Sequence, residues 1–206
     1  MRRPLIPVAF ALSAITPALA SAQHFTGGDK LTKLSAPVLL DTTGMFQAKI
    51  ARVGDDMFVG GQPTEKALRE MLAQGVTTVV NLRTPIEMTR SVKFDEPALV
   101  AQLGMKYVYL PVRGDTAYPY APETVKKFSQ AVRESKGKVL LHCTVGWRAS
   151  HLWAAYLIQE RGVPLEDALA NASAINLGGR DPRMPGRQPI EDFLNRDLPS
   201  LGRTPH

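Results

Sequence analysis

The 206-residue chain contains one cysteine, Cys143, so it cannot form an internal disulfide bond. Its four histidines are not arranged at metal-ligand spacing, and we predict neither a metal site nor a cofactor. Its lysines and arginines form no stripe with interleaved aromatic residues, so no nucleic-acid surface is predicted. No internal repeat or low-complexity segment occurs. These absences favour one globular domain, held together by the core that a 44% hydrophobic composition supplies.

The long apolar run at the N-terminus has the organisation of a secretory signal peptide. Two arginines precede an apolar stretch from Leu5 to Leu19, and small residues follow in "PALASAQ". Two prolines interrupt the stretch, so a retained membrane anchor is the poorer interpretation. Cleavage fits after Ala20 or after Ala22, and we prefer Ala22. We therefore expect residues 1–22 to be removed, leaving a periplasmic or secreted protein without stable membrane insertion.

The charge balance indicates little about partners by itself. The formal net charge of +6 suits an anionic substrate and equally well favours solubility. In an oxidising compartment, however, a spare thiol is a liability unless it is buried or useful. Export of the chain therefore favours a functional role for Cys143. The sequence contains no feature that predicts an oligomeric state.

After a leader at residues 23–55, the chain alternates between predicted strands and helices. The strands are expected at 56–61, 76–83, 105–112 and 138–143, and the helices at 63–75, 95–104, 121–137, 148–162 and 164–175. This order predicts an α/β fold with a mostly parallel sheet of about four to five strands flanked by helices. The domain is expected to span residues 56–198, followed by a tail at 199–206.

The segment "KVLLHCTVGWRAS" places Cys143 where a buried strand turns into a helix. The helix N-terminus and Arg148 supply positive potential, which favours the thiolate form of a cysteine. Gly146 permits the tight turn, and the planar guanidinium of Arg148 matches an oxyanion in a bidentate manner. A lone cysteine after "VLL" is most often a small core residue. The combination with His142, Gly146 and Arg148 favours a nucleophile instead.

Four segments carry a resemblance to a known family: "VGGQPT", "GVTTVVNLR", "YVYLPV" and "LLHCTVGWR". Their order and spacing resemble the phosphatase-like domain of the bacterial beta-lactamase-hydrolase-like family, which is related to dual-specificity and protein tyrosine phosphatases. The resemblance covers about residues 55–175. It implies a cysteine-phosphatase fold, a nucleophilic Cys143 and an oxyanion-binding Arg148. The loop that it implies for substrate binding consists of Thr144, Val145, Gly146 and Trp147.

The resemblance also implies roles for residues outside this loop. Asp115 follows "YVYLPV", where related phosphatases carry an aspartic general acid, although an aspartate after Gly114 is equally typical of a turn. Arg83 is expected to buttress the loop, or else to extend from a strand end into solvent. Independently of the resemblance, ring hydrogen bonds of His142 are expected to orient the loop. The hydroxyl that stabilises the leaving thiolate in related loops follows the arginine directly, whereas here the nearest candidate is Ser150, one residue later.

Two departures from the family pattern leave alternatives open. Four residues separate Cys143 from Arg148, whereas protein tyrosine phosphatases generally have five; four is the spacing of many rhodanese-type sulfurtransferases. In addition, Ala149 stands where related loops commonly carry serine or threonine. We expect an exported phosphatase that hydrolyses a phosphorylated small molecule or phosphoprotein through a phosphocysteine. The alternatives are a sulfurtransferase with a Cys143 persulfide and a non-catalytic anion-binding module.

Overall fold

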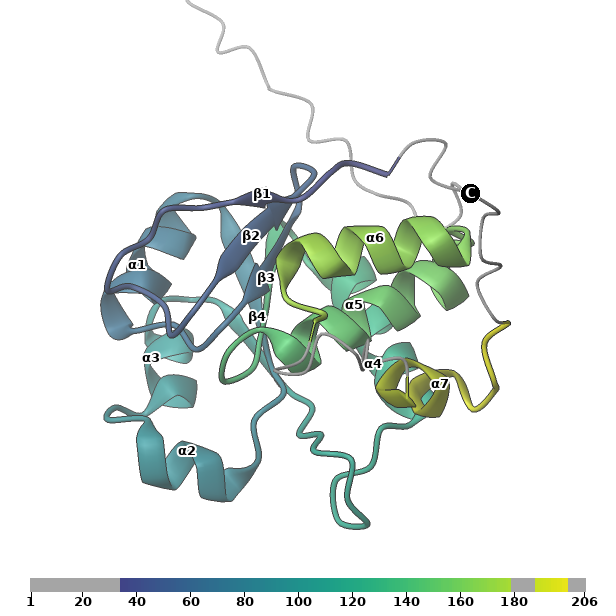
Figure 1. Ribbon diagram of the computed structural model, residues 1–206. Helices are drawn as coiled ribbons and strands as arrows, with labels where there is room; N and C mark the ends of the chain where they lie inside the picture. Colours follow the sequence, from purple (N-terminus) through teal and green to yellow (C-terminus); the bar gives the residue numbers. More distant parts are fainter. Residues whose placement is uncertain (1–33, 179–187, 200–206) are drawn as a thin grey trace, which may run out of the picture.

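The structure of the protein is a computed structural model, and it describes residues 34–178 and 188–199. These residues form a mixed α/β fold in which helices flank a six-stranded sheet (Figure 1). The predicted signal peptide and nearly all of the predicted tail lie outside the described residues. Within the described part of the chain, no helix is long and apolar enough to cross a membrane.

The sheet is mostly parallel, as predicted, and its strand order is β1-β2-β3-β6-β4-β5. The strands are β1 (Val38–Leu39), β2 (Ile50–Val53), β3 (Met57–Gly60), β4 (Val76–Asn81), β5 (Lys106–Tyr109) and β6 (Lys138–His142). Strands β3, β6, β4 and β5 pair in parallel, whereas β1 and β2 are antiparallel additions at one edge.

The sheet begins earlier in the chain than the sequence indicates. Strands β1 and β2 belong to residues 23–55, which the sequence analysis assigns to a leader. Ile50 and Ala51 are fully buried, and β2 pairs with β3 across a turn that contains Gly54 at φ 60°. Strand β1 has only two residues, both exposed, and Arg52 interrupts the apolar residues of β2, so neither shows a clear alternation in the sequence.

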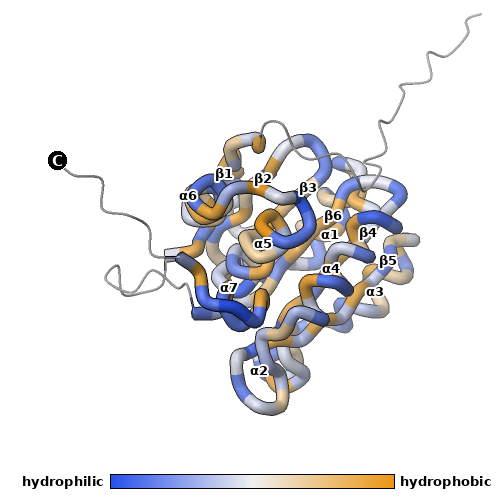
Figure 2. Tube along the Cα trace, turned by 90° about the vertical axis from the view of Figure 1, so that its right-hand side faces the viewer, coloured by the Kyte–Doolittle hydropathy of each residue, from blue (hydrophilic) through white to orange (hydrophobic). Residues whose placement is uncertain are grey.

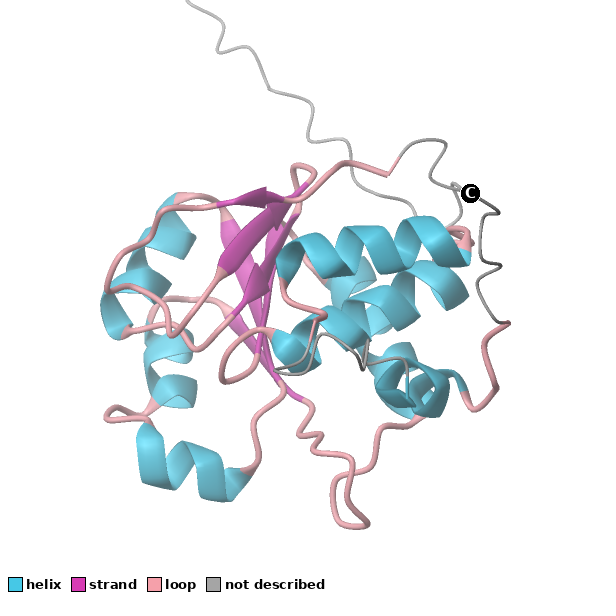
Figure 3. Ribbon diagram, in the orientation of Figure 1, coloured by secondary structure: helices cyan, strands magenta, loops and turns pink. Residues whose placement is uncertain are grey.

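Helices cover both faces of the sheet (Figure 2, Figure 3). They are α1 (Glu65–Ala73), α2 (Pro85–Ser91), α3 (Glu96–Gln102), α4 (Pro122–Glu134), α5 (Trp147–Glu160), α6 (Leu165–Ile175) and α7 (Gln188–Leu194). Helices α1 and α3 lie against one face, and α4 to α7 lie on the other. Helix α2 projects beyond the end of the sheet in both views (Figure 1, Figure 2).

Both faces of the central strand β6 pack into the hydrophobic core. Leu140 packs into the hydrophobic cluster on the side of α1 and α3, and Leu141 into the larger cluster on the side of α5. Because β6 lies between β3 and β4, its carboxyl end is surrounded by the segments that follow those two strands. The residue after β6 is Cys143, so the sheet places this cysteine at the centre of its carboxyl edge.

Candidate active site

Cys143 begins the turn that joins β6 to α5. Its backbone N–H donates to the carbonyl of Gly60 at 3.2 Å, and Gly146 caps α5 with a positive φ of 86°. The first N–H groups of α5 have no partners inside the helix, so they supply positive potential next to this turn. The cysteine is only 1% exposed and belongs to the larger core cluster. This burial is also typical of a small core residue. The side chains around Cys143 therefore decide whether it is interpreted as a nucleophile or as part of the core.

The Cys143 loop is braced by the two glycines of "VGGQPT". Gln62 donates its backbone N–H to the Thr144 carbonyl at 3.0 Å, directly after the bridge between Gly61 and Val145. A Cβ at Gly61 would lie 1.6 Å from the carbonyl oxygen of Gln47, so no side chain fits there. On the opposite side of the loop, Asn176 donates to the Val145 carbonyl at 2.7 Å. Contacts from two distant segments therefore hold the loop in shape.

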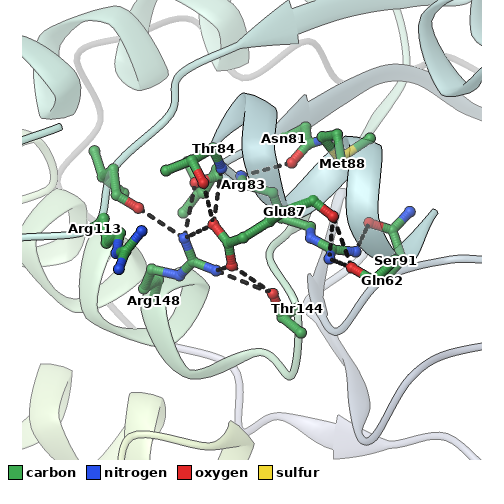
Figure 4. A network of polar contacts seen from close by, with 12 residues as sticks. Gln62, Asn81, Arg83, Thr84, Glu87, Met88, Ser91, Arg113, Thr144 and Arg148 are labelled. Carbon is green, nitrogen blue, oxygen red and sulfur yellow. Dashed lines mark hydrogen bonds and ion pairs between the residues drawn. The ribbon is translucent and has the colours of Figure 1, made fainter. Parts of the chain in front are cut away.

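Arg148, in the first turn of α5, is bound in a bidentate manner by Glu87 of α2 (Figure 4). Its Nη2 donates to Glu87 Oε1 at 2.5 Å, and its Nη1 donates to Glu87 Oε2 at 3.0 Å and to the Val112 carbonyl at 2.8 Å. Thr144 joins the pair, because its hydroxyl lies 3.0 Å from both Glu87 Oε1 and Arg148 Nη2. None of the described hydrogen bonds of Arg148 uses Nε. The guanidinium is therefore held along its Nη1–Nη2 edge.

The electrostatics of the Glu87–Arg148 pair keep both groups charged. Burial is the largest influence on the pKa of Glu87 and raises it, but hydrogen bonds from Arg148 and Thr84 outweigh burial and lower the pKa to about 2. Burial likewise lowers the pKa of Arg148, but the hydrogen bonds that Arg148 donates to Glu87, together with nearby negative charge, raise it above its ordinary value. The side chains of Arg148 and Glu87 are 11% and 26% exposed.

Glu87 is absent from the residues that the sequence analysis singled out, because α2 was not predicted. The signal for this helix is present in "TPIE". Glu87 Oε2 accepts from the backbone N–H of Thr84 at 2.9 Å and from its hydroxyl at 2.8 Å, while Pro85 occupies the first helical position. A threonine with glutamate three residues later marks a helix start, and proline at the first position supports it. That pattern predicts the helix, but not the contact with Arg148.

A buried polar network lies behind the loop and involves Glu96, which the sequence analysis also missed. His142 and Glu96 are fully buried, and His142 Nε2 lies 3.0 Å from Glu96 Oε1. The same carboxylate accepts from Asn81 at 3.1 Å and from Gln62. Burial raises the pKa of Glu96, but the charge and hydrogen bond of His142 outweigh this and lower it. An acidic residue at the start of a helix normally faces water, so nothing local in the sequence marks Glu96.

Arg83 connects this network to α2. The residue is 1% exposed, its Nη1 donates to Gln62 Oε1 at 2.8 Å, and its Nη2 donates to the Glu87 carbonyl at 3.1 Å and to Ser91. Arg83 thus contacts both the segment that braces the Cys143 loop and the helix that holds Arg148. The structure places Arg83 inside the site and not in solvent at the end of a strand.

Asp115 and Ser150 form hydrogen bonds with backbone groups of their own segments. Asp115 Oδ1 accepts from the backbone N–H groups of Ala117 and Tyr118 at 3.1 and 2.9 Å, which is a turn arrangement, and Oδ2 lies 3.4 Å from Arg113 Nε. No described contact joins Asp115 to Cys143 or Arg148. The Ser150 hydroxyl donates to the Gly146 carbonyl at 2.8 Å, one helical turn back. The structure therefore brings neither the Ser150 hydroxyl nor the Asp115 carboxyl group to the Cys143 sulfur.

A pocket of about 440 Å³ opens beside Arg148 and Glu87, and Cys143 is not among the residues that line it. Its walls combine α2, the loop after β5 and the start of α5, and its lining residues are Ile86, Glu87, Arg90, Arg113, Tyr120, Trp147 and Arg148. Burial raises the pKa of Tyr120 to about 12, so this pocket wall carries a neutral hydroxyl at physiological pH. Trp147 packs against His151, with ring centroids 4.1 Å apart. Basic and aromatic groups thus surround the accessible side of Arg148. Such a pocket suits an anion attached to an organic group.

Comparison with known proteins agrees with this geometry. The family model described as "DSP-PTPase phosphatase fused to NAD+ Kinase" matches residues 43–183, more than half of the chain. A curated relative, the beta-lactamase hydrolase-like protein of Xylella fastidiosa (strain Temecula1), is 26% identical over 133 residues, which are 63% of this chain and 30% of the relative. The chain therefore spans less than a third of the length of that relative.

Solved structures of cysteine phosphatases share the fold. TpbA from P. aeruginosa superimposes with a TM-score of 0.53 at 21% identity, over 77% of this chain and 90% of TpbA. PTPMT1 gives a TM-score of 0.54 at 20% identity, over 71% of this chain and 94% of PTPMT1. At these identities the likeness concerns the fold, and it confirms the cysteine-phosphatase-like architecture expected from the sequence.

Proposed function

We propose that the chain, which belongs to the DSP-PTPase family whose model it matches, hydrolyses phosphomonoesters through a phosphocysteine intermediate at Cys143. The observation that carries the proposal is the arrangement of the Cys143 loop. The cysteine lies at the carboxyl end of the central strand, the helix N-terminus follows, and Glu87 holds Arg148 by one edge. Such a loop binds an oxyanion next to a thiolate.

The reaction has two steps. The Cys143 thiolate attacks phosphorus, so that an S–P bond forms while the P–O bond to the leaving group breaks. The Nε–H of Arg148 and the N–H groups at the start of α5 bind the equatorial oxygens of the phosphoryl group. Asp115 donates a proton to the leaving oxygen. Water then attacks phosphorus, the S–P bond breaks, and inorganic phosphate leaves. Neither step requires a metal ion or an organic cofactor.

Parallel assays of one preparation test this function against its alternatives. We expect phosphate release from an aryl phosphate, and no thiocyanate from thiosulfate plus cyanide. The four-residue spacing between Cys143 and Arg148 is the observation that favours a sulfurtransferase. Thiocyanate production, with a sulfur atom added to Cys143 in mass spectra, would replace the phosphatase proposal by that one. Phosphate binding without turnover of either substrate would instead indicate an anion-binding module.

Asp115 is proposed as the general acid although it lies in a turn in this structure. The proposal requires the loop between β5 and α4 to move when substrate binds, which its exposed residues permit. Asp115→Asn is expected to slow hydrolysis of an alkyl phosphate by about 10²–10³-fold, because a poor leaving group needs the proton. The loss should be much smaller for 4-nitrophenyl phosphate, whose leaving group departs as an anion. Equal losses for both substrates would mean that Asp115 only shapes the loop.

Export to the periplasm or the medium is proposed from the N-terminal sequence. Two arginines, an apolar stretch and a small-residue cleavage site stand in the order of a signal peptide. Expression of the full chain in a Gram-negative host should yield a periplasmic protein whose first residue is Gln23, as read by N-terminal mass spectrometry. Ala20→Pro together with Ala22→Pro, which alters both possible cleavage sites, should leave uncleaved precursor. Recovery of the wild-type chain with residues 1–22 intact would contradict the proposal.

A further inference from the structure

The positive charge that lines the pocket is not confined to Arg148. Three arginines line it, Arg90, Arg113 and Arg148, whereas Glu87 is the one carboxylate in the described lining. Both oxygens of Glu87 are already bound by Arg148. The phosphoryl group of a substrate would occupy the remaining Nε–H of Arg148 and the loop. Arg90 and Arg113 are therefore the two lining arginines that Glu87 does not neutralise.

Neither of these two arginines is firmly paired. Arg113 Nε lies 3.4 Å from Asp115 Oδ2, but the two side chains are 58% and 46% exposed, and such a surface pair contributes little. Arg90, in the last turn of α2, is exposed, and no ion pair of the described ranges 34–178 and 188–199 includes it. A ligand anion entering the pocket has little competition for either guanidinium.

Apart from Glu87 and the three arginines, the residues that line the pocket are apolar or aromatic. Ile86 is 45% exposed at the pocket, and Trp147 and the neutral Tyr120 complete the lining. The volume of about 440 Å³ lies in the range of pockets that hold organic molecules of drug size, far above what a phosphate ion fills. A pocket of this volume with aromatic side chains in its walls therefore suits a flat organic ring.

We propose that the substrate is an aryl phosphomonoester with a second anionic group, and that Arg90 and Arg113 bind this second group. The inference rests on the proposed function in that the scissile phosphoryl group is placed at Arg148. The second group is a carboxylate or a second phosphate, since either forms charge-assisted hydrogen bonds with guanidinium groups. The aromatic ring lies between the two anions, against Trp147 and Tyr120. Arg90 and Arg113 thus select among phosphomonoesters according to their charge.

The test compares pairs of ligands that differ in one charge. Calorimetry on Cys143→Ser protein would give the Kd of carboxyphenyl phosphate and of carbamoylphenyl phosphate, each as the 3- and 4-substituted isomer. We expect the carboxylate to bind about 10-fold tighter in at least one isomer, and this ratio to decrease as salt is added. Phenylene bisphosphate, in a third arm, shows whether a second phosphate is preferred to a carboxylate.

Variants then assign the effect to the two arginines. In a Cys143→Ser background, Arg90→Gln with Arg113→Gln should bring the Kd ratio close to 1. A matched control, Lys66→Gln with Arg69→Gln, removes the same charge from exposed positions of α1 and should leave the ratio unchanged. Equal Kd values in the parent protein, or a ratio that survives loss of both arginines, would overturn the proposal. An equal weakening of both ligands would also overturn it, because the arginines would then bind the scissile phosphate.

The Kd values are measured without turnover. The second anion site and the phosphatase function can therefore be contradicted independently of each other. Hydrolysis by the wild-type chain without any charge preference leaves the phosphatase function standing and removes the second anion site. Charge-selective binding without hydrolysis supports the anion site and removes the phosphatase function. Failure of every ligand to bind removes the second anion site together with the placement of the phosphoryl group at Arg148.

Discussion

Cys143→Ser is expected to lower kcat for phosphomonoester hydrolysis by at least about 10⁴-fold, because a serine hydroxyl stays protonated where a cysteine forms a thiolate. Single-turnover phosphate release with enzyme in excess measures this loss. The side chain is 1% exposed, and oxygen replaces sulfur with little change of volume, so the fold should persist. Thermal unfolding and the Kd for inorganic phosphate provide the controls. Steady turnover by Cys143→Ser protein would refute the phosphocysteine mechanism.

The single cysteine offers an independent check without further substitutions. Alkylation of the wild-type chain modifies Cys143 alone, so loss of activity can be followed against the modification of one residue. Inorganic phosphate is expected to slow alkylation, because an anion held by Arg148 covers the loop. Alkylation that proceeds to completion without loss of phosphatase activity would contradict the proposed role of Cys143.

Glu87→Gln is expected to lower kcat/KM by about 10²-fold, because the guanidinium of Arg148 loses the charged partner that holds its Nη1–Nη2 edge. Glu87 acts as a positioning residue, so the loss should appear in the Kd for phosphate as well as in kcat. Glu134→Gln is the matched control, since it removes an exposed ion pair with Lys106 outside the pocket. An increase in activity would mean that Glu87 competes with the substrate for Arg148.

The same variant gives a pH-dependent difference in stability. The pKa of Glu87 falls from 4.5 to about 2 in the folded protein, so the folded state favours the ionised carboxylate. The resulting stabilisation is fully present above pH 4.5 and is lost as the pH falls through about 2. The difference in unfolding temperature between wild-type and Glu87→Gln proteins should therefore be constant near neutrality and diminish between pH 4.5 and 2. A difference that is constant over this range would contradict the ion pair.

The order of most strands and helices along the chain was predictable, because their capping residues and hydrophobic periodicity are local features of the sequence. Thr64 accepts from the backbone N–H of Ala67 as the expected N-cap of α1, and Gly75 follows that helix with a φ of 90°. The strands that became β3 to β6 and the helices that became α1, α3, α4, α5 and α6 all lie where periodicity places them. Strands β1 and β2 and helices α2 and α7 were missed, and short length alone is not the reason, since β3, β5 and α3 are as short as β2, α2 and α7. Both residues of β1 are exposed, and α2 has no buried residue, so neither element carries a clear apolar pattern.

The sequence alone determined that one cysteine stands between a buried strand and a helix, five positions before an arginine. That arrangement depends on neighbouring residues, whose propensities and turn chemistry act locally. Only the tertiary structure decided what this loop touches: Arg148 meets Glu87 across 61 residues of chain, and His142 meets Glu96 across 46. It also placed Arg90 and Arg113 in one pocket with Arg148. Contacts of this kind arise when separate elements pack on one sheet, and no local pattern encodes which side chains meet.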